Sequence, residues 1–183
     1  KKTYKFKIGP QTFFQNNIYI IAKVVNYIIN NLNNYIGDCS EYSLLDFYCG
    51  VGTIGICLAD RFKNVLGLDI IKDSIKLAKK NAEHNGIDNA KYSFTDLNKE
   101  EIKNFDENSV LIIDPPRSGV GKETTERILN LKPLIIFYIS CNPITEIQDL
   151  EILYKKYEIL EVKGFDMFPQ TYHIENIVMM KRI

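Results

Sequence analysis

Short apolar runs recur along this chain, and most of them end at a glycine, an aspartate, a proline or a cysteine. Apolar runs of about four to eight residues with such boundaries are typical of buried β-strands. Strands that are buried on both faces need helices to cover them, which restricts the chain to a layered fold. The predicted strands span residues 43–50, 64–70, 90–97, 109–116, 133–140, 157–168 and 173–183.

Stretches with a helical period separate most of these strands. In one of them Ile21, Val25 and Ile28 share a face, and in another Gly86 is the expected C-terminal stop. Strands that alternate with helices indicate parallel βαβ units, whereas the last two strands have no helix between them and should pair antiparallel. We expect an α/β, Rossmann-like, doubly wound and mostly parallel seven-stranded sheet with an antiparallel last strand. The predicted helices span residues 17–36, 52–61, 72–86, 121–131 and 143–156.

Composition narrows the class of protein. The 183 residues are 45% hydrophobic, which suits one domain with a substantial core. No apolar run approaches the ~20 residues that span a membrane. Lys+Arg and Asp+Glu both number 23, and a neutral domain is a poor nucleic-acid binder by itself. The basic clusters at residues 1–7, 79–80 and 155–156 are each more typical of a solvated face.

The cysteines do not have the spacing of a metal centre. Cys39, Cys49, Cys57 and Cys141 form no CxxC pair, and the chain has only two histidines. We therefore expect neither zinc nor an iron–sulfur cluster in these residues. Free thiols favour a reducing, cytoplasmic location.

Cys141 lies within FYISCNPITE, residues 137–146, where a predicted strand gives way to Asn142 and Pro143. A free cysteine is often a small core residue. This one, however, follows the carboxyl end of a strand, where α/β sheets bind their ligands. A thiolate at such a place is a strong nucleophile, so both interpretations stay open on the pattern alone.

Glycines and acids mark three other strand ends. Gly50, Gly52 and Gly55 allow either a tight turn without a ligand or close approach to a nucleotide-like one. Asp69 and Asp96 close the next two strands and suit a ribose hydroxyl and an adenine amino group. NAD would account for Asp69 alone, whereas S-adenosylmethionine would account for the whole set and for the antiparallel last strand.

The fourth strand ends in IIDPPRSG, where Asp114 precedes two prolines that fix an extended loop. Methyltransferases that act on exocyclic amines carry a similar Asp-Pro-Pro, followed by an aromatic residue that stacks on the base. Arg117 stands in that place here. It is either a surface residue, a contact to RNA phosphate or a group that orients a catalytic residue.

The last feature is FPQTYHIEN, residues 168–176. Pro169 bends the chain, and strand alternation puts His173 and Glu175 on one face. A carboxyl beside an apolar strand has the raised pKa that suits a proton acceptor. The alternatives are a polar surface face and a structural, hydrogen-bonded His173.

Five of these stretches, in order, resemble the motifs of the S-adenosylmethionine-dependent RNA uracil-C5 methyltransferases. That family makes 5-methyluridine in tRNA and in 23S rRNA. The resemblance runs from about Phe6 to the end of the chain. It implies a class I methyltransferase fold, and it implies an enzyme that uses S-adenosylmethionine to methylate a uridine in RNA. The matching stretches are IGPQTFFQNN, LLDFYCGVGT, DPPRSG, ISCNP and FPQTYHIE.

The resemblance also implies roles for single residues. Cys141 matches the nucleophile that adds to C6 of uracil, and Glu175 matches the base that removes the C5 proton. At Asp69 the family usually has glutamate, so the carboxylate here is one methylene shorter. The positions that match cofactor contacts are Gln15, Tyr48, Gly50, Thr53, Asp69, Asp96 and Asp114.

Family members carry a further N-terminal RNA-binding domain, in some of them with an iron–sulfur cluster. We therefore expect residues 1–183 to be a single catalytic domain from the C-terminal part of a longer, cytoplasmic, monomeric protein that acts on RNA and not on a membrane. Two other functions stay open. One is a methyltransferase for a base amine or a small molecule, which would leave Cys141 and Glu175 idle, and the other is a non-catalytic, RNA-associated module that binds S-adenosylmethionine.

Overall fold

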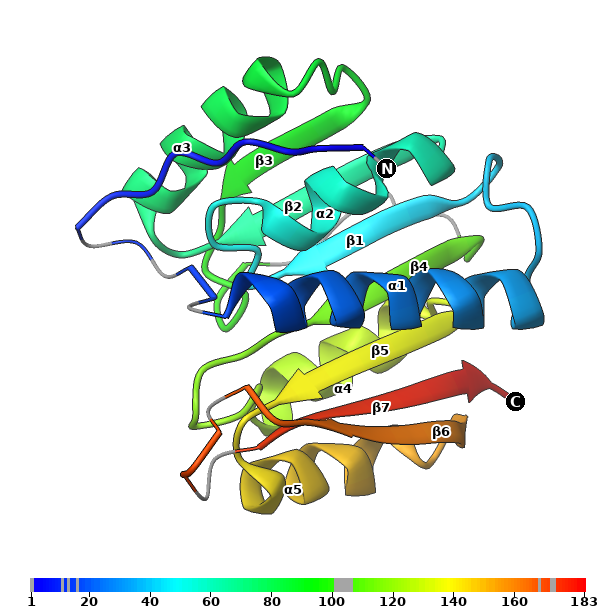
Figure 1. Cartoon of the computed structure of the whole chain (residues 1–183). Helices are drawn as coiled ribbons and strands as arrows, with labels where there is room; N and C mark the ends of the chain where they lie inside the picture. The colour runs from blue at the N-terminus through cyan, green and yellow to red at the C-terminus, as the bar shows by residue number, and fades with distance from the viewer. Residues whose placement is uncertain are drawn as a thin grey trace. The chain divides into compact units, whose positions relative to one another are not determined.

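The computed structural model describes residues 2–10, 12, 14–15, 17–100, 107–167, 169–171 and 174–183 (Figure 1). The chain divides into two compact units, Lys1–Asp96 and Leu97–Ile183. Each unit has its own strands and its own helices.

Three parallel strands form the sheet of the first unit, in the order β3-β2-β1. Each connection between consecutive strands passes through a helix, as the alternation along the sequence predicts. The strands are β1 (Ser43–Phe47), β2 (Asn64–Asp69) and β3 (Ala90–Phe94). The helices are α1 (Ile18–Tyr35), α2 (Thr53–Leu58), with the short 3₁₀ helix η1 (Ala59–Arg61) after it, and α3 (Lys72–His84).

Side chains and glycines set the helix ends in this unit. The side chain of Asn17 accepts a hydrogen bond from the backbone N–H of Ile20 and so caps α1. Helix α3 ends just before Gly86, whose φ of 68° lies in the left-handed region that helix C-termini favour. The predicted stop at Gly86 is confirmed, although the helix itself ends two residues earlier than the predicted range.

The second unit has four strands, in the order β4-β5-β7-β6. Strand β7 lies antiparallel to both of its neighbours, so the predicted antiparallel pairing of the closing strands is confirmed, as is the mostly parallel α/β class. Every residue of β4 and β5 is buried, so these two strands form the core of the unit. The elements are β4 (Ser109–Ile113), α4 (Lys122–Leu131), β5 (Ile135–Ser140), α5 (Pro143–Leu153), β6 (Tyr157–Phe165) and β7 (Glu175–Arg182).

Several predicted strands are too long at their carboxyl ends. The strand predicted over residues 43–50 ends at Phe47, because Tyr48 and Gly50 have φ of 60° and 53°, which an extended strand cannot hold. The strand predicted over residues 109–116 ends at Ile113, before the two prolines that lack a backbone donor. In both cases the residues assigned to a strand belong to the turn that follows it.

The buried ring of Tyr92, on β3, explains several of the glycines near the end of β1. A Cβ atom on Gly67 would lie 2.4 Å from Cδ1 of that ring, and one on Gly52 would lie 3.0 Å from Cζ. A Cβ atom on Gly55 would lie 2.8 Å from Oδ2 of Asp46 and 3.2 Å from the Tyr92 hydroxyl. Gly52 and Gly67 therefore make room for an aromatic side chain of the same unit, and Gly55 makes room for that ring and for the Asp46 carboxylate.

We expect Gly67→Ala to destabilise the chain by about 1–3 kcal/mol, because the added methyl group overpacks against the Tyr92 ring. Urea unfolding of Gly67→Ala, Tyr92→Leu and the double variant tests this cause. The penalty of Gly67→Ala should largely disappear once Leu replaces the ring. An equal penalty in both backgrounds would show that Tyr92 is not the reason for this glycine.

Candidate active site

The turn between β1 and α2 is the first candidate site. Its backbone carries three positive φ angles within five residues, at Tyr48 (60°), Gly50 (53°) and Gly52 (82°). Glycine adopts such angles without cost, whereas a half-buried tyrosine does so only where the surroundings hold it. The turn is therefore a built feature of the unit, and Thr53 opens α2 directly after it.

Two carboxylates accept from backbone N–H groups in this turn and beside it. Asp69 accepts from Gly50 N at 2.8 Å through one oxygen and from Ile71 N at 2.8 Å through the other. Buried Asp46 accepts from Gly55 N at 3.0 Å. Each carboxylate oxygen has a second acceptor position, so Asp69 can hold the turn and still accept a hydroxyl from a ligand.

Asn81 of α3 supports the same turn, and the sequence reasoning missed it. Its side chain is fully buried and donates to the carbonyl of Val51 at 3.1 Å. It also donates to the carbonyl of Lys7 at 3.1 Å and accepts from Lys7 N at 2.7 Å. An asparagine on the apolar face of the predicted helix 72–86 was the available signal, because a buried amide needs partners.

The other residues of the first unit that are predicted to contact the cofactor are buried or half-buried. Gln15 is buried, whereas Thr53 and Asp96 are half-buried, and Asp96 lies two residues beyond the end of β3. Asp69 and Asp96 thus follow neighbouring parallel strands. Asp114 belongs to the second unit, where it follows β4.

In the second unit the strand register brings the two predicted catalytic residues together. Strands β5 and β7 pair antiparallel with Ile139 opposite Ile177 and Ser140 opposite Asn176. Cys141 follows Ser140 directly after the end of β5, and Glu175 precedes Asn176 as the first residue of β7, so the two residues adjoin the last pair of this register. The charge of Glu175 acts on the Cys141 thiol at this place.

Burial and neighbouring charges shift the pKa values of both Cys141 and Glu175. Burial and the charge of Glu175 raise the pKa of the Cys141 thiol, whereas the Arg117 guanidinium lowers it. Burial and the charge of Asp114 raise the pKa of Glu175 to about 7, against the opposing effect of Arg117. A carboxyl with this pKa can accept and release a proton near neutral pH.

Hydrogen bonds tie the loop after β4 to the loop after β5. The side chains of Asn142 and Thr145 both donate to the carbonyl of Arg117, at 2.9 Å and 3.1 Å. The Asn142 side chain also accepts from Ile144 N and so caps α5, in which Pro143 is the first residue. Pro143 therefore ends the strand by starting a helix directly after the thiol.

Asp149 fixes the same region from inside α5. Its buried carboxylate accepts from Val120 N at 2.7 Å, from Gly121 N at 3.0 Å and from the Tyr138 hydroxyl at 2.6 Å. It therefore connects α5 to the start of α4 and to β5. The sequence reasoning did not single out Asp149, because an acid in a helix usually faces solvent.

Glu146, in the first turn of α5, is a second buried carboxyl that the sequence reasoning missed. One of its oxygens accepts from the Asn176 side chain at 2.8 Å, and the other has no hydrogen-bond partner among the described residues. Burial raises the pKa of Glu146 to about 7. Asn176 is the neighbour of Glu175 along β7, so this carboxyl lies close to the proposed base.

Two sequence predictions are limited by what the structure covers. His173 and part of the FPQTYHIE stretch lie outside the described residues. Among the helices that are described, none combines the length and apolar character that crossing a bilayer requires.

Comparison with solved structures identifies the fold. The chain superposes on an N-methyltransferase from Bradyrhizobium japonicum with a TM-score of 0.70 at 9% identity, over 91% of this chain and 98% of that one. It superposes on the tRNA (uracil-54, C5)-methyltransferase of Pyrococcus abyssi, solved with S-adenosyl-L-homocysteine, with a TM-score of 0.80 at 36% identity. That match covers 94% of this chain and 41% of the other. The fold is that of the class I, Rossmann-like methyltransferases.

The chain belongs to the tRNA (uracil-5-)-methyltransferase family, whose family model matches residues 1–183. It is 37% identical to an uncharacterised RNA methyltransferase of Caldanaerobacter subterraneus, over 97% of this chain and 39% of the relative. It is 36% identical to the tRNA (uracil(54)-C(5))-methyltransferase of Saccharomyces cerevisiae, over 98% of this chain and 30% of the relative. The chain thus spans less than half the length of these relatives.

We expect Glu146 to make stability depend on pH. The pKa of Glu146 is about 7 in the folded chain and near 4.5 when unfolded. The contribution of this group to folding stability is therefore full below about pH 4.5 and is lost as the pH rises through about 7. Glu146→Gln keeps an acceptor for Asn176 and removes the titration. Each pKa unit corresponds to about 1.4 kcal/mol. Between about pH 5 and pH 8, the free energy of unfolding should therefore fall by at least about 1 kcal/mol less in the variant than in wild type.

Urea unfolding at the two pH values measures this difference, with Glu151→Gln, an exposed position on the same helix, as the matched control. The control should follow wild type. A Glu146→Gln variant with the same pH dependence as wild type would contradict the assignment.

Proposed function

We propose that this chain transfers a methyl group from S-adenosylmethionine to C5 of a uridine in RNA, through a covalent bond between Cys141 and C6 of the uracil. The observation that carries the proposal is that Cys141 and Glu175 adjoin the last β5–β7 pair, Ser140 and Asn176. A nucleophile and a proton acceptor at the same end of neighbouring strands are the two groups that this chemistry needs. Family membership supports the same reaction.

The donor set of the first unit fits S-adenosylmethionine. Carboxylates at the ends of two neighbouring strands suit the hydroxyls and the amino group of an adenosine, and Asp69 keeps acceptor capacity beyond its backbone contacts. When bound, the cofactor supplies an electrophilic methyl group. The residues of this unit that we propose to hold it are Gln15, Tyr48, Gly50, Thr53, Asp69 and Asp96, whereas a cofactor contact by Asp114 stays a prediction from the sequence.

Uracil C5 is a weak nucleophile, and the protein groups supply what it lacks. The Cys141 thiolate adds to C6, which moves an electron pair towards the C4 carbonyl and makes C5 nucleophilic. The positive charge of Arg117 favours the thiolate. After methylation, Glu175 takes the C5 proton, the C5–C6 double bond re-forms, and Cys141 leaves with the electron pair of the C6–S bond.

The substrate class follows from the relatives. The Saccharomyces cerevisiae and Pyrococcus abyssi proteins are named for uridine 54 of tRNA, which makes a tRNA uridine our first candidate. A uridine in 23S rRNA is the second candidate, on the family resemblance alone. A single catalytic domain, a cytoplasmic location and a monomeric state stay predictions from the sequence.

Two other functions are less well supported. A methyltransferase for amines or small molecules would give Cys141 no reason to adjoin the same strand pair as Glu175. In a non-catalytic module, nothing would require Glu175, with a pKa of about 7, to act on the Cys141 thiol together with Arg117. Both would be favoured over our proposal if no covalent intermediate forms.

Glu175→Gln should stop the reaction after methylation, because the C5 proton then has no acceptor. We expect at least an approximately 100-fold loss of kcat and the accumulation of a covalent protein–RNA adduct on ordinary uridine-containing tRNA. Denaturing gels with labelled RNA detect the adduct, and RNA with 5-fluorouridine should trap the same species on the unaltered protein.

Cys141→Ala should abolish the adduct in both settings, whereas Cys57→Ala, which removes another half-buried thiol, should leave it unchanged. An adduct that persists without Cys141 would refute the assignment of the nucleophile. The absence of any adduct with tRNA or rRNA would refute the proposed reaction.

A further inference from the structure

The N-terminal segment, residues 2–10, lies along α3 and is held there by two asparagine side chains (Figure 1). Asn85 accepts from Lys5 N at 2.9 Å and donates to the Lys5 carbonyl at 2.8 Å. Asn81 makes the same pair of contacts with Lys7, at 2.7 Å and 3.1 Å. The two amides thus bind alternate residues of the segment as a neighbouring β-strand would.

This pairing fixes which way the side chains of the segment point. The Tyr4 hydroxyl donates to the Cys57 carbonyl, and the Phe6 ring lies 6.0 Å from that of Phe14, so these aromatic residues face the unit. Alternation then directs Lys5 and Lys7 away from it, and both are exposed.

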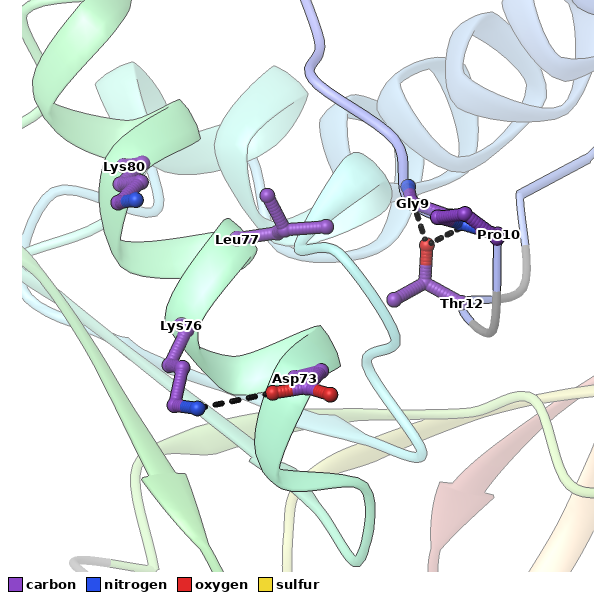
Figure 2. Close-up of a pocket in the computed structure, with 7 residues that line it drawn as sticks. All are labelled: Gly9, Pro10, Thr12, Asp73, Lys76, Leu77 and Lys80. Atoms are coloured by element: carbon purple, nitrogen blue, oxygen red, sulfur yellow. Dashed lines mark hydrogen bonds and ion pairs between the residues drawn. The ribbon is translucent and has the colours of Figure 1, made fainter.

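The exposed flank of α3 beside the segment carries more lysines. Lys76 and Lys80, one helical turn apart, line a pocket of about 380 Å³ (Figure 2). The other lining residues are Asp73, Leu77, Gly9, Pro10 and Thr12. Figure 2 shows Leu77 pointing from α3 towards Gly9 and Thr12. The structure thus brings together residues from two basic clusters that are more than 70 positions apart in the sequence.

Acidic residues offset only part of the charge of this surface. Asp73 pairs with Lys76 at 2.9 Å, and the two side chains are 59% and 72% exposed. Glu83 is a second acid on α3, and Lys2 is already paired with Asp60. Lys5, Lys7 and Lys80 have no acidic partner among the described ion pairs.

We propose that Lys5, Lys7, Lys76 and Lys80 form a binding surface for the phosphate backbone of the substrate RNA. This inference rests on the proposed function, which makes RNA the substrate. In a chain with no net charge, RNA needs a local concentration of cations, and this surface provides one. The Asn81 and Asn85 contacts hold the segment in place, so the surface exists before RNA binds.

The salt dependence of RNA binding tests the surface directly. We would measure binding of a labelled tRNA by fluorescence anisotropy over a range of KCl concentrations, for wild type and for Lys5→Gln/Lys7→Gln/Lys76→Gln/Lys80→Gln. Each lost phosphate contact reduces the slope of log K against log[salt] by about 0.7–0.9, so the fourfold variant should lose about 3. The control is Lys155→Gln/Lys156→Gln, the third basic cluster, which should keep the wild-type slope.

The catalytic readout separates this inference from the proposed function. The fourfold variant should raise KM for RNA and keep kcat and the Cys141-dependent adduct at saturating RNA. An unchanged slope and KM, with the adduct intact, would refute the surface alone. A fourfold variant that loses binding to phosphatidylserine vesicles but not to tRNA would also refute it, in favour of a membrane contact.

Discussion

The carbonyl oxygen of Arg117 is the point on which the reactive end of the second unit depends. Asn142 and Thr145 both donate to it, so hydrogen bonds join the loop that follows Asp114 to the loop that carries Cys141. Asp149 binds the next part of the first loop through two backbone N–H groups. The guanidinium and the thiol therefore come from separate loops and are positioned together before any substrate arrives.

The first unit follows the same physical rule with a different set of partners. A turn with several left-handed residues exposes backbone donors and acceptors that must be satisfied. Asp69 accepts from Gly50 N in this turn, Asp46 accepts from Gly55 N in the helix that follows it, and Asn81 donates to the carbonyl of Val51. The acids at these strand ends thus have a structural role in the free chain as well as the role in cofactor binding that we propose.

The sequence predicts most of this fold, because its signals are local. The apolar runs, the helical periods and the stop at Gly86 each depend on residues near in the chain, and the absence of a helix before the last strand predicts its antiparallel pairing. Cys141 and Glu175 were found because they end or begin strands within recognisable motifs. Asn142 and Pro143, which end β5 and begin α5, were visible in the same way.

The features that the sequence did not predict depend on packing between residues that are distant in the chain. That Tyr92 fills the space at Gly67, and that Asn81 joins Lys7 to Val51, follows only from the arrangement of strands and helices. In the sequence Glu146 is an ordinary acidic residue of a helix, yet in the structure its side chain points into the protein, next to Asn176. The strand ends were overestimated because the left-handed backbone at Tyr48 and Gly50 is not visible in the sequence, and because the predicted strand was continued through Pro115 and Pro116.

The central claim is that the opposing charges of Arg117 and Glu175 both act on the Cys141 thiol. The rate of Cys141 alkylation by iodoacetamide as a function of pH, followed by peptide mass spectrometry, measures the pKa of this thiol. Arg117→Gln should raise that pKa, because a stabilising positive charge is lost, and Glu175→Gln should lower it, because a repelling negative charge is lost. The same pKa in wild type and in both variants would contradict the account.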